Sequence, residues 1–103
     1  MAKVKDMILT FPPSGSPDVV GYMLYIQIAP DPITYDSESF DLGLNTTIDI
    51  ATLPGMTTKD DIYNMGVTAV DEAGNESSFS LINDVPLDFV APDPPGPLSF
   101  ISG

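Results

Sequence analysis

Proline and glycine divide this chain into apolar segments that are too short for a helical fold. The 103 residues include 11 prolines and 8 glycines, and most of them stand between the apolar runs rather than inside them. A proline has no backbone N–H to donate, so it interrupts helices and the ladders of central strands. No segment keeps the periodicity of an amphipathic helix. The sequence therefore predicts strands joined by turns.

Five short segments are expected to be strands, because side chains alternate between the two faces of a strand. They span residues 4–11, 21–28, 46–53, 62–70 and 77–85, and the polar stretch at 30–45 is expected to be a loop with a short edge strand near Ser39–Leu42. Ile48 and Ile50 are expected to face inward. Within each other strand, alternation places together on one face Met7, Leu9 and Phe11; Tyr22, Leu24, Ile26 and Ile28; and Tyr63, Met65, Val67 and Ala69. The segment 21–28 is apolar on its other face too, which suggests a central or covered strand. Short strands punctuated by turns predict an all-β fold, an antiparallel two-sheet β-sandwich.

The charged residues exclude several classes of partner. The chain has 15 acidic residues against three lysines and no histidine, which gives a net charge of -12. A protein without cationic side chains cannot neutralise phosphates, so nucleic acid is not expected as a partner, and an anionic membrane surface is disfavoured for the same reason. The simplest interpretation of the acidic excess is a solvated face that keeps the protein soluble.

The side chains that usually carry catalysis are missing. With no histidine and no cysteine, the common general base and the thiol nucleophile are absent, and the absence of cysteine also leaves no disulfide. Paired carboxylates could cleave glycosides only in a deep cleft, which a domain of this size does not provide. We therefore expect no enzyme activity and no cofactor.

Two clusters of residues are candidate sites. Oxygen ligands suit calcium, and the weak candidates are Asp71, Glu72, Asn75 and Glu76, although turn geometry alone accounts for Gly74 and Asn75, which tolerate positive φ. No metal site is therefore expected. The aromatic residues Tyr25, Tyr35 and Phe40 form a candidate protein-binding patch, with covering of the sheet as the plainer alternative.

Residues 63–77 resemble the F strand and following turn of a fibronectin type III domain, with Tyr63, alternating apolar residues and then Asp-x-x-Gly-Asn-x-Ser. Gly21-Tyr22-x-Leu24 resembles the opening of strand C, and Thr47–Ile50 followed by Leu53 resembles strand E. The resemblance covers about residues 4–90, with Phe11 where strand B usually carries tryptophan. It implies a domain at 1–90 with the immunoglobulin-like sandwich of that family.

The family's proline-rich opening and leucine-bearing strand A stand here at the other end of the chain, in a tail at residues 91–103. The tail residues expected to make contacts are Pro92, Pro94, Pro95, Pro97, Leu98 and Phe100. Three interpretations stay open: the tail begins a further domain, it supplies a strand to its own sheet, or it donates that strand to a neighbouring copy.

The expected function is structural. A small acidic sandwich with a strand-like tail suits a protein that decorates or links a larger assembly through protein–protein contacts or self-association. By analogy of fold, it resembles accessory or decoration proteins of phage virions. The alternative is a spacer or binding module from a larger secreted or cell-surface protein. The chain as given shows no signal peptide and no run of transmembrane length, so virion surface and extracellular locations both stay open.

Overall fold

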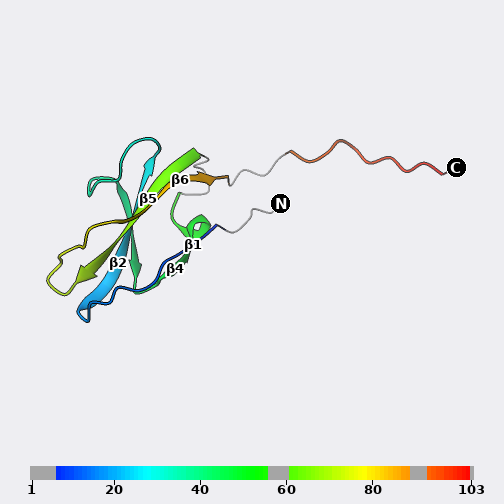
Figure 1. The fold of residues 1–103 in the computed structure, drawn as a ribbon. Helices are drawn as coiled ribbons and strands as arrows, with labels where there is room; N and C mark the ends of the chain where they lie inside the picture. The colour runs from blue at the N-terminus through cyan, green and yellow to red at the C-terminus, as the bar shows by residue number, and fades with distance from the viewer. Residues whose placement is uncertain (1–6, 56–60, 89–92, 103) are drawn as a thin grey trace.

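The computed structural model describes residues 7–55, 61–88 and 93–102 of the chain (Figure 1). Their fold is all-β, as predicted, and contains no α-helix within these ranges. The elements are β1 (Ile8–Thr10), β2 (Val19–Ile28), β3 (Glu38–Gly43), β4 (Thr47–Asp49), the 3-10 helix η1 (Ile50–Thr52), β5 (Asp61–Asp71) and β6 (Ser80–Leu87). In the described part of the chain, no helix is long and apolar enough to cross a membrane.

The strands form two antiparallel sheets. One has two strands, β1 and β4, and the other has four, in the order β3-β2-β5-β6. The centre of the larger sheet is the long pairing of β2 with β5, in which Tyr25 lies opposite Gly66 and Ile26 opposite Met65. The segment at 21–28 is therefore a central strand, which explains why it is apolar on both faces.

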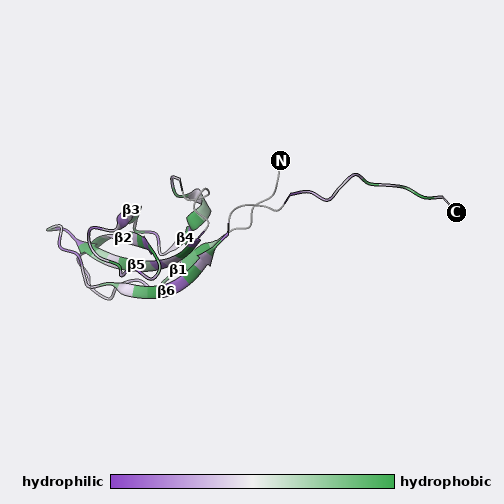
Figure 2. Ribbon diagram, turned by 90° about the horizontal axis from the view of Figure 1, so that it is seen from above, coloured by the Kyte–Doolittle hydropathy of each residue, from purple (hydrophilic) through white to green (hydrophobic). Residues whose placement is uncertain are grey.

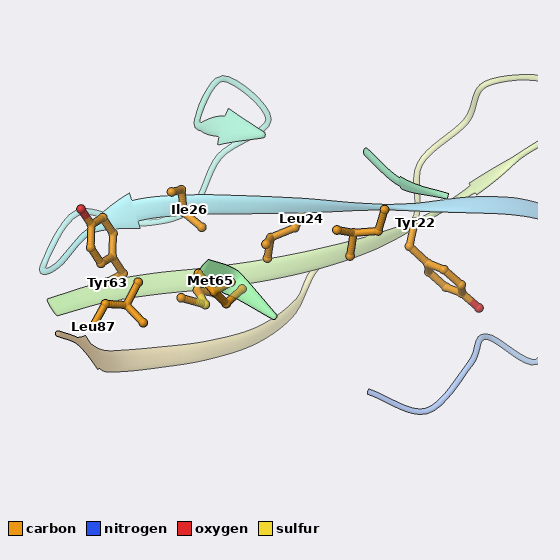
Figure 3. Close-up of a cluster of buried hydrophobic side chains, with 8 residues drawn as sticks. Tyr22, Leu24, Ile26, Tyr63, Met65 and Leu87 are labelled. Atoms are coloured by element: carbon orange, nitrogen blue, oxygen red, sulfur yellow. The ribbon is translucent and has the colours of Figure 1, made fainter. Parts of the chain in front are cut away.

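One face of the larger sheet carries the core, and alternation predicted most of its members. Leu24 is completely buried and Ile26 and Met65 are nearly so, and Figure 3 shows them in line with Tyr22, Tyr63 and Leu87 along β2, β5 and β6. The partly buried residues packed against this cluster include the predicted Met7, Leu9, Phe11, Ile48, Val67 and Ala69. Figure 2 shows hydrophobic residues recurring along these strands.

The structure corrects the prediction for residues 46–53. The strand β4 ends at Asp49, and the next residues form η1 instead of continuing the ladder. Asp49 causes this change, because one of its carboxylate oxygens accepts the N–H of Ala51 at 3.0 Å and so caps a turn of helix. Ile50 is nevertheless buried, as predicted, because the helical turn still directs it into the core.

Smaller corrections concern element ends and one turn. Ile28 shares a face with Ile26, as predicted, and lies opposite Tyr63, but it is 46% exposed because β2 ends there. The last strand lies at Ser80–Leu87, later than predicted, while β3 at Glu38–Gly43 contains the edge strand expected near Ser39–Leu42. Gly74 takes the expected positive φ of 86°, whereas Asp84 rather than Asn75 is the non-glycine residue with positive φ among the described residues.

Candidate interaction surfaces

An aromatic cluster covers the face of the larger sheet opposite the core. Tyr25 projects from β2 and meets Tyr35 from the following loop and Phe79 from the segment before β6, with ring centroids 6.0 and 5.3 Å from that of Tyr25. The Tyr35 and Phe79 rings lie closer still, at 4.5 Å. Edge-to-face contacts of this kind stabilise beyond the apolar area they bury. The cluster makes Tyr25 a buried residue although it faces away from the core.

A glycine in β5 makes room for this cluster. A Cβ atom on Gly66 would lie 3.1 Å from side-chain atoms of Phe79 and Leu81 and 3.2 Å from one of Ile33. These distances are tighter than ordinary van der Waals contact, so the covering side chains sit directly on the backbone of the strand. A glycine inside a strand often marks such a close approach.

Hydrogen bonds fasten the rim of the aromatic cluster to the turn at residues 72–79. The Tyr25 hydroxyl donates to Oε1 of Glu76 at 2.5 Å, and the hydroxyl of the buried Thr68 donates to the same oxygen at 2.7 Å. The Tyr35 hydroxyl donates to the carbonyl of Ser77 at 2.9 Å. Burial, and then the hydrogen bond and charge of Glu76, raise the pKa of Tyr25 to about 12. Tyr25 is therefore a neutral donor at physiological pH and serves to hold the turn.

The structure brings together two of the three residues in the predicted aromatic patch. Tyr25 and Tyr35 are in contact, but Phe40 lies in β3 and packs against the core on the opposite face. Phe79 takes its place, and sequence reasoning missed it because residues 77–85 were expected to be strand, whereas β6 begins only at Ser80 and leaves Phe79 in the segment before it. The one available signal was Gly66, an otherwise unexplained glycine within a predicted strand.

The acidic turn at residues 71–76 uses its oxygen atoms internally. Asp71 Oδ1 accepts the N–H groups of Ala73 and Asn75 at 3.0 and 2.9 Å, and Oδ2 accepts from the Asn75 amide at 3.1 Å. The hydrogen bond from the Asn75 side chain, followed by those from the turn backbone, lowers the pKa of Asp71. Glu76 is turned toward Tyr25, away from this loop's centre, while Glu72 is exposed. Among the described residues, no group of three or more acidic, cysteine or histidine side chains could hold a metal ion.

A loop cavity of about 400 Å³ lies beside Pro30, Ile33, Asn64 and Asp84. Its main polar side chain is already used structurally: the Asn64 amide donates to the carbonyl of Asp31 at 2.8 Å and accepts the N–H of Asp84 at 3.1 Å. Asn64 therefore ties the loop after β2 and the irregular point of β6 at Asp84 to β5, and these hydrogen bonds are not directed toward a ligand.

Two neighbouring cavities lie between the β1 segment and β6, with volumes of about 210 and 180 Å³. They share Phe11, Pro12, Val67 and Ser80, and together we call them the β1–β6 groove. The first is lined further by Leu9, Thr10, Met65, Gly66, Leu81 and Ile82, and the second by Ser14, Tyr22, Thr68, Ala69, Ser77 and Ser78. Each cavity is smaller than the roughly 300–1,000 Å³ typical of small-molecule pockets.

The described part of the tail, residues 93–102, has no regular structure and projects away from the sheets (Figures 1 and 2). Leu98, Phe100 and Ile101 are 94%, 97% and 89% exposed. Pro94, Pro95 and Pro97 are exposed too, and Pro92 lies outside the described residues. The largest apolar side chains of the tail are thus exposed to solvent and lie away from the chain's own sheets.

Three comparisons with known proteins found no protein similar to this chain. No protein-family model matches it, and searches of curated proteins and of solved structures found no match.

Proposed function

We propose that this chain is a non-enzymatic structural protein, a fibronectin type III-like β-sandwich that links or decorates a larger assembly through protein–protein contacts. The observation that carries the proposal is the tail: three large apolar residues, Leu98, Phe100 and Ile101, are almost fully exposed in a chain of strongly acidic composition. Exposed apolar side chains that stand together mark surfaces that other proteins cover.

The strand pairing supports the sandwich form of this proposal. In the fibronectin type III-like interpretation, β1, β4, β2 and β5 correspond to strands B, E, C and F. In immunoglobulin-like sandwiches, B and E belong to one sheet and C and F to the other. Here β1 pairs with β4, and β2 pairs with β5. The position beside β1, where strand A would stand, has no occupant among the described residues.

The most specific form of the proposal is an accessory or decoration protein of a phage virion. It is supported by analogy with small single-domain sandwiches on capsids and tails. The acidic surface is consistent with this role, because net charge of one sign keeps copies soluble until specific contacts bring them together.

Light scattering on the intact chain, beside a chain truncated after Val90, tests the proposal. We expect the intact protein to form a defined oligomer and the truncated protein to be monomeric with the same melting temperature. A full-length Leu98→Ser/Phe100→Ser variant is the matched control, because it keeps the prolines and the length but removes the apolar side chains. Two monomers of equal stability would contradict assembly through the tail and would favour a spacer module with a proline-rich linker.

A further inference from the structure

Among the residues that the structure describes, no strand pairs with the outer edge of β1. On its inner side the ladder to β4 extends beyond the strand itself: the Met7 carbonyl accepts the N–H of Ile50 at 2.8 Å, and the Phe11 N–H donates to the carbonyl of Thr46 at 3.0 Å. Backbone groups alternate in direction along an antiparallel strand. The N–H and C=O groups of Ile8 and Thr10 therefore point away from β4, and within the described residues β1 has no second strand as a neighbour.

Both edges of the larger sheet carry features that discourage pairing. The edge strand β3 has the exposed carboxylates of Glu38 and Asp41, and β6 has a positive φ of 56° at Asp84 followed by Pro86. Charges, irregular backbone and proline are the devices by which proteins protect strand edges. Residues 7–11 contain neither a charge nor a proline. Of these three edges, that of β1 is the one suited to accept another strand.

The surface next to this edge is neutral and apolar. None of the acidic residues that the structure describes lines the β1–β6 groove, although acidic residues are spread over most of the chain. Its lining includes the core residues Met65 and Val67 together with Ile82, which is 49% exposed on β6, whereas the Leu81 side chain covers Gly66 on the opposite face. A second molecule of this chain is itself acidic. To approach the groove without bringing the carboxylates of the two copies together, it would have to use a neutral segment.

The tail is such a segment. Residues 93–103 contain one acidic residue, Asp93, and no other charged side chain. In an extended strand Leu98 and Phe100 share one face, and Ser99 and Ile101 share the other. The stretch from Pro97 to Ser102 is about as long as the open edge from Met7 to Phe11. Its apolar face would meet the groove while its backbone would meet the edge.

The course of the chain favours a second copy over the chain's own groove. The groove lining places Leu9–Phe11 beside Ser80–Ile82 and Phe11–Ser14 beside Ser77–Ser80, so β1 and β6 run in opposite directions. A tail pairing antiparallel to its own β1 would have to return along the eight residues of β6, about 27 Å. The ten residues 88–97, four of them proline, span at most about 33–36 Å, so such a return would need this segment to be close to fully extended. A tail from another copy meets no such limit.

We infer that residues 97–102 of one copy add as an antiparallel strand to β1 of a second copy, with Leu98 and Phe100 entering the β1–β6 groove. The inference rests on the proposed assembly function and specifies its contact. Strand addition of this kind takes its affinity from main-chain hydrogen bonds and its specificity from pockets for alternate side chains. Because each copy has both a tail and an edge, the contact builds either a closed ring or an open chain of copies.

Site-directed cross-linking tests the contact, because the natural chain has no cysteine and gives no background. Ser99→Cys in one chain is mixed with Thr10→Cys, and separately with Ile8→Cys, in a second chain of distinguishable mass. Both acceptor positions lie on the exposed face of β1, where directly opposite residues on paired strands have Cβ atoms about 4.5–5.5 Å apart. We expect a mixed disulfide dimer at one of these two positions. An acceptor carrying Asp41→Cys on β3 is the control and should give none.

The outcomes separate the contact from the function. An oligomer that forms but cross-links equally through position 41, or through neither position of β1, overturns the β1 contact and leaves the assembly function standing. A Thr10→Cys/Ser99→Cys double variant that closes a disulfide within one chain, at dilution, overturns the exchange between copies. A strictly monomeric intact chain refutes both. Adding Leu98→Ser/Phe100→Ser to the tail donor should abolish the cross-link, and a cross-link that persists would contradict the role of the groove.

Discussion

Replacing Tyr25 by phenylalanine tests how the aromatic cluster is held together. The substitution keeps the ring between Tyr35 and Phe79 but removes the hydroxyl that donates to Glu76 at 2.5 Å. A hydrogen bond to a charged group contributes about 1.5–3 kcal/mol. Since Thr68 still donates to the same carboxylate oxygen, Glu76 keeps one partner, and we expect the free energy of unfolding to fall by about 2 kcal/mol near pH 8.

The same substitution is expected to change how stability depends on alkaline pH. The pKa of Tyr25 is raised from 10.0 to about 12 in the folded protein, so the unfolded chain loses this proton first as pH rises. The stabilisation is complete below pH 10 and is lost as pH rises through the folded pKa. At pH 11 the wild-type protein has lost about 1.4 kcal/mol of its free energy of unfolding through this proton. The phenylalanine variant has no hydroxyl at this position and keeps its free energy of unfolding in this respect. The difference between wild type and variant should therefore shrink from about 2 to about 0.6 kcal/mol.

Urea unfolding followed by far-UV circular dichroism at pH 8 and pH 11 measures both effects. Tyr35→Phe is the matched control, because it removes a hydroxyl that donates to a backbone carbonyl from a side chain that is 54% exposed. It should cost no more than about 1 kcal/mol. Equal losses for the two substitutions, or a wild-type advantage that stays constant between the two pH values, would refute the reasoning.

Four further predictions address the core and the acidic turn. Leu24→Ala, at a completely buried position, should lower the free energy of unfolding by about 2–5 kcal/mol in urea titrations, whereas Ile82→Ala on the half-exposed β6 should cost clearly less; similar losses would contradict the assignment of the core face. Gly74→Ala, at a φ of 86°, should cost about 1–2 kcal/mol, and an unchanged melting temperature would show that the turn relaxes. Because folding lowers the pKa of Asp71, its carboxylate stabilises the folded state above the unfolded pKa of 3.8, and this stabilisation is lost as pH falls through the folded pKa. Asp71→Asn should therefore make the free energy of unfolding depend less on pH in the acidic range. Because the Asp71 oxygens already accept hydrogen bonds within the turn, calcium and chelator should give the same melting temperature, and a rise with calcium would contradict that assignment.

The strands and their inward faces could be predicted because alternation is a local property. A residue in an extended chain shares its face with the residues two before and two after it, whatever lies elsewhere in the molecule. The inward placement of Leu24, Ile26 and Met65 followed from this period alone. The end of β4 could not be predicted in this way, because it depends on one hydrogen bond from the N–H of Ala51 to the Asp49 carboxylate. A single aspartate in an alternating segment does not change the alternation that predicts a strand.

The candidate sites were predicted less completely because they are made of residues that meet only in three dimensions. Tyr25 and Tyr35 were grouped correctly with each other, but Phe40 belongs to the core side and Phe79 to the cluster. A side chain in a loop has no alternation that assigns it to a face. Its position is set by the turn that carries it, here the one fastened by Glu76.

The sequence by itself determined that the chain is all-β, which residues form most of the core, and that its tail is apolar with a single charge in an otherwise acidic protein. Each of these follows from composition or from the two-residue period of a strand. The tertiary structure alone decided that Gly66 lies beneath a second layer of side chains, that β1 has one open edge, and that a groove lies between β1 and β6. These features depend on which strands pair with one another. Strand pairing joins segments that are distant in the sequence, and the residues of one segment do not show which other segment it pairs with.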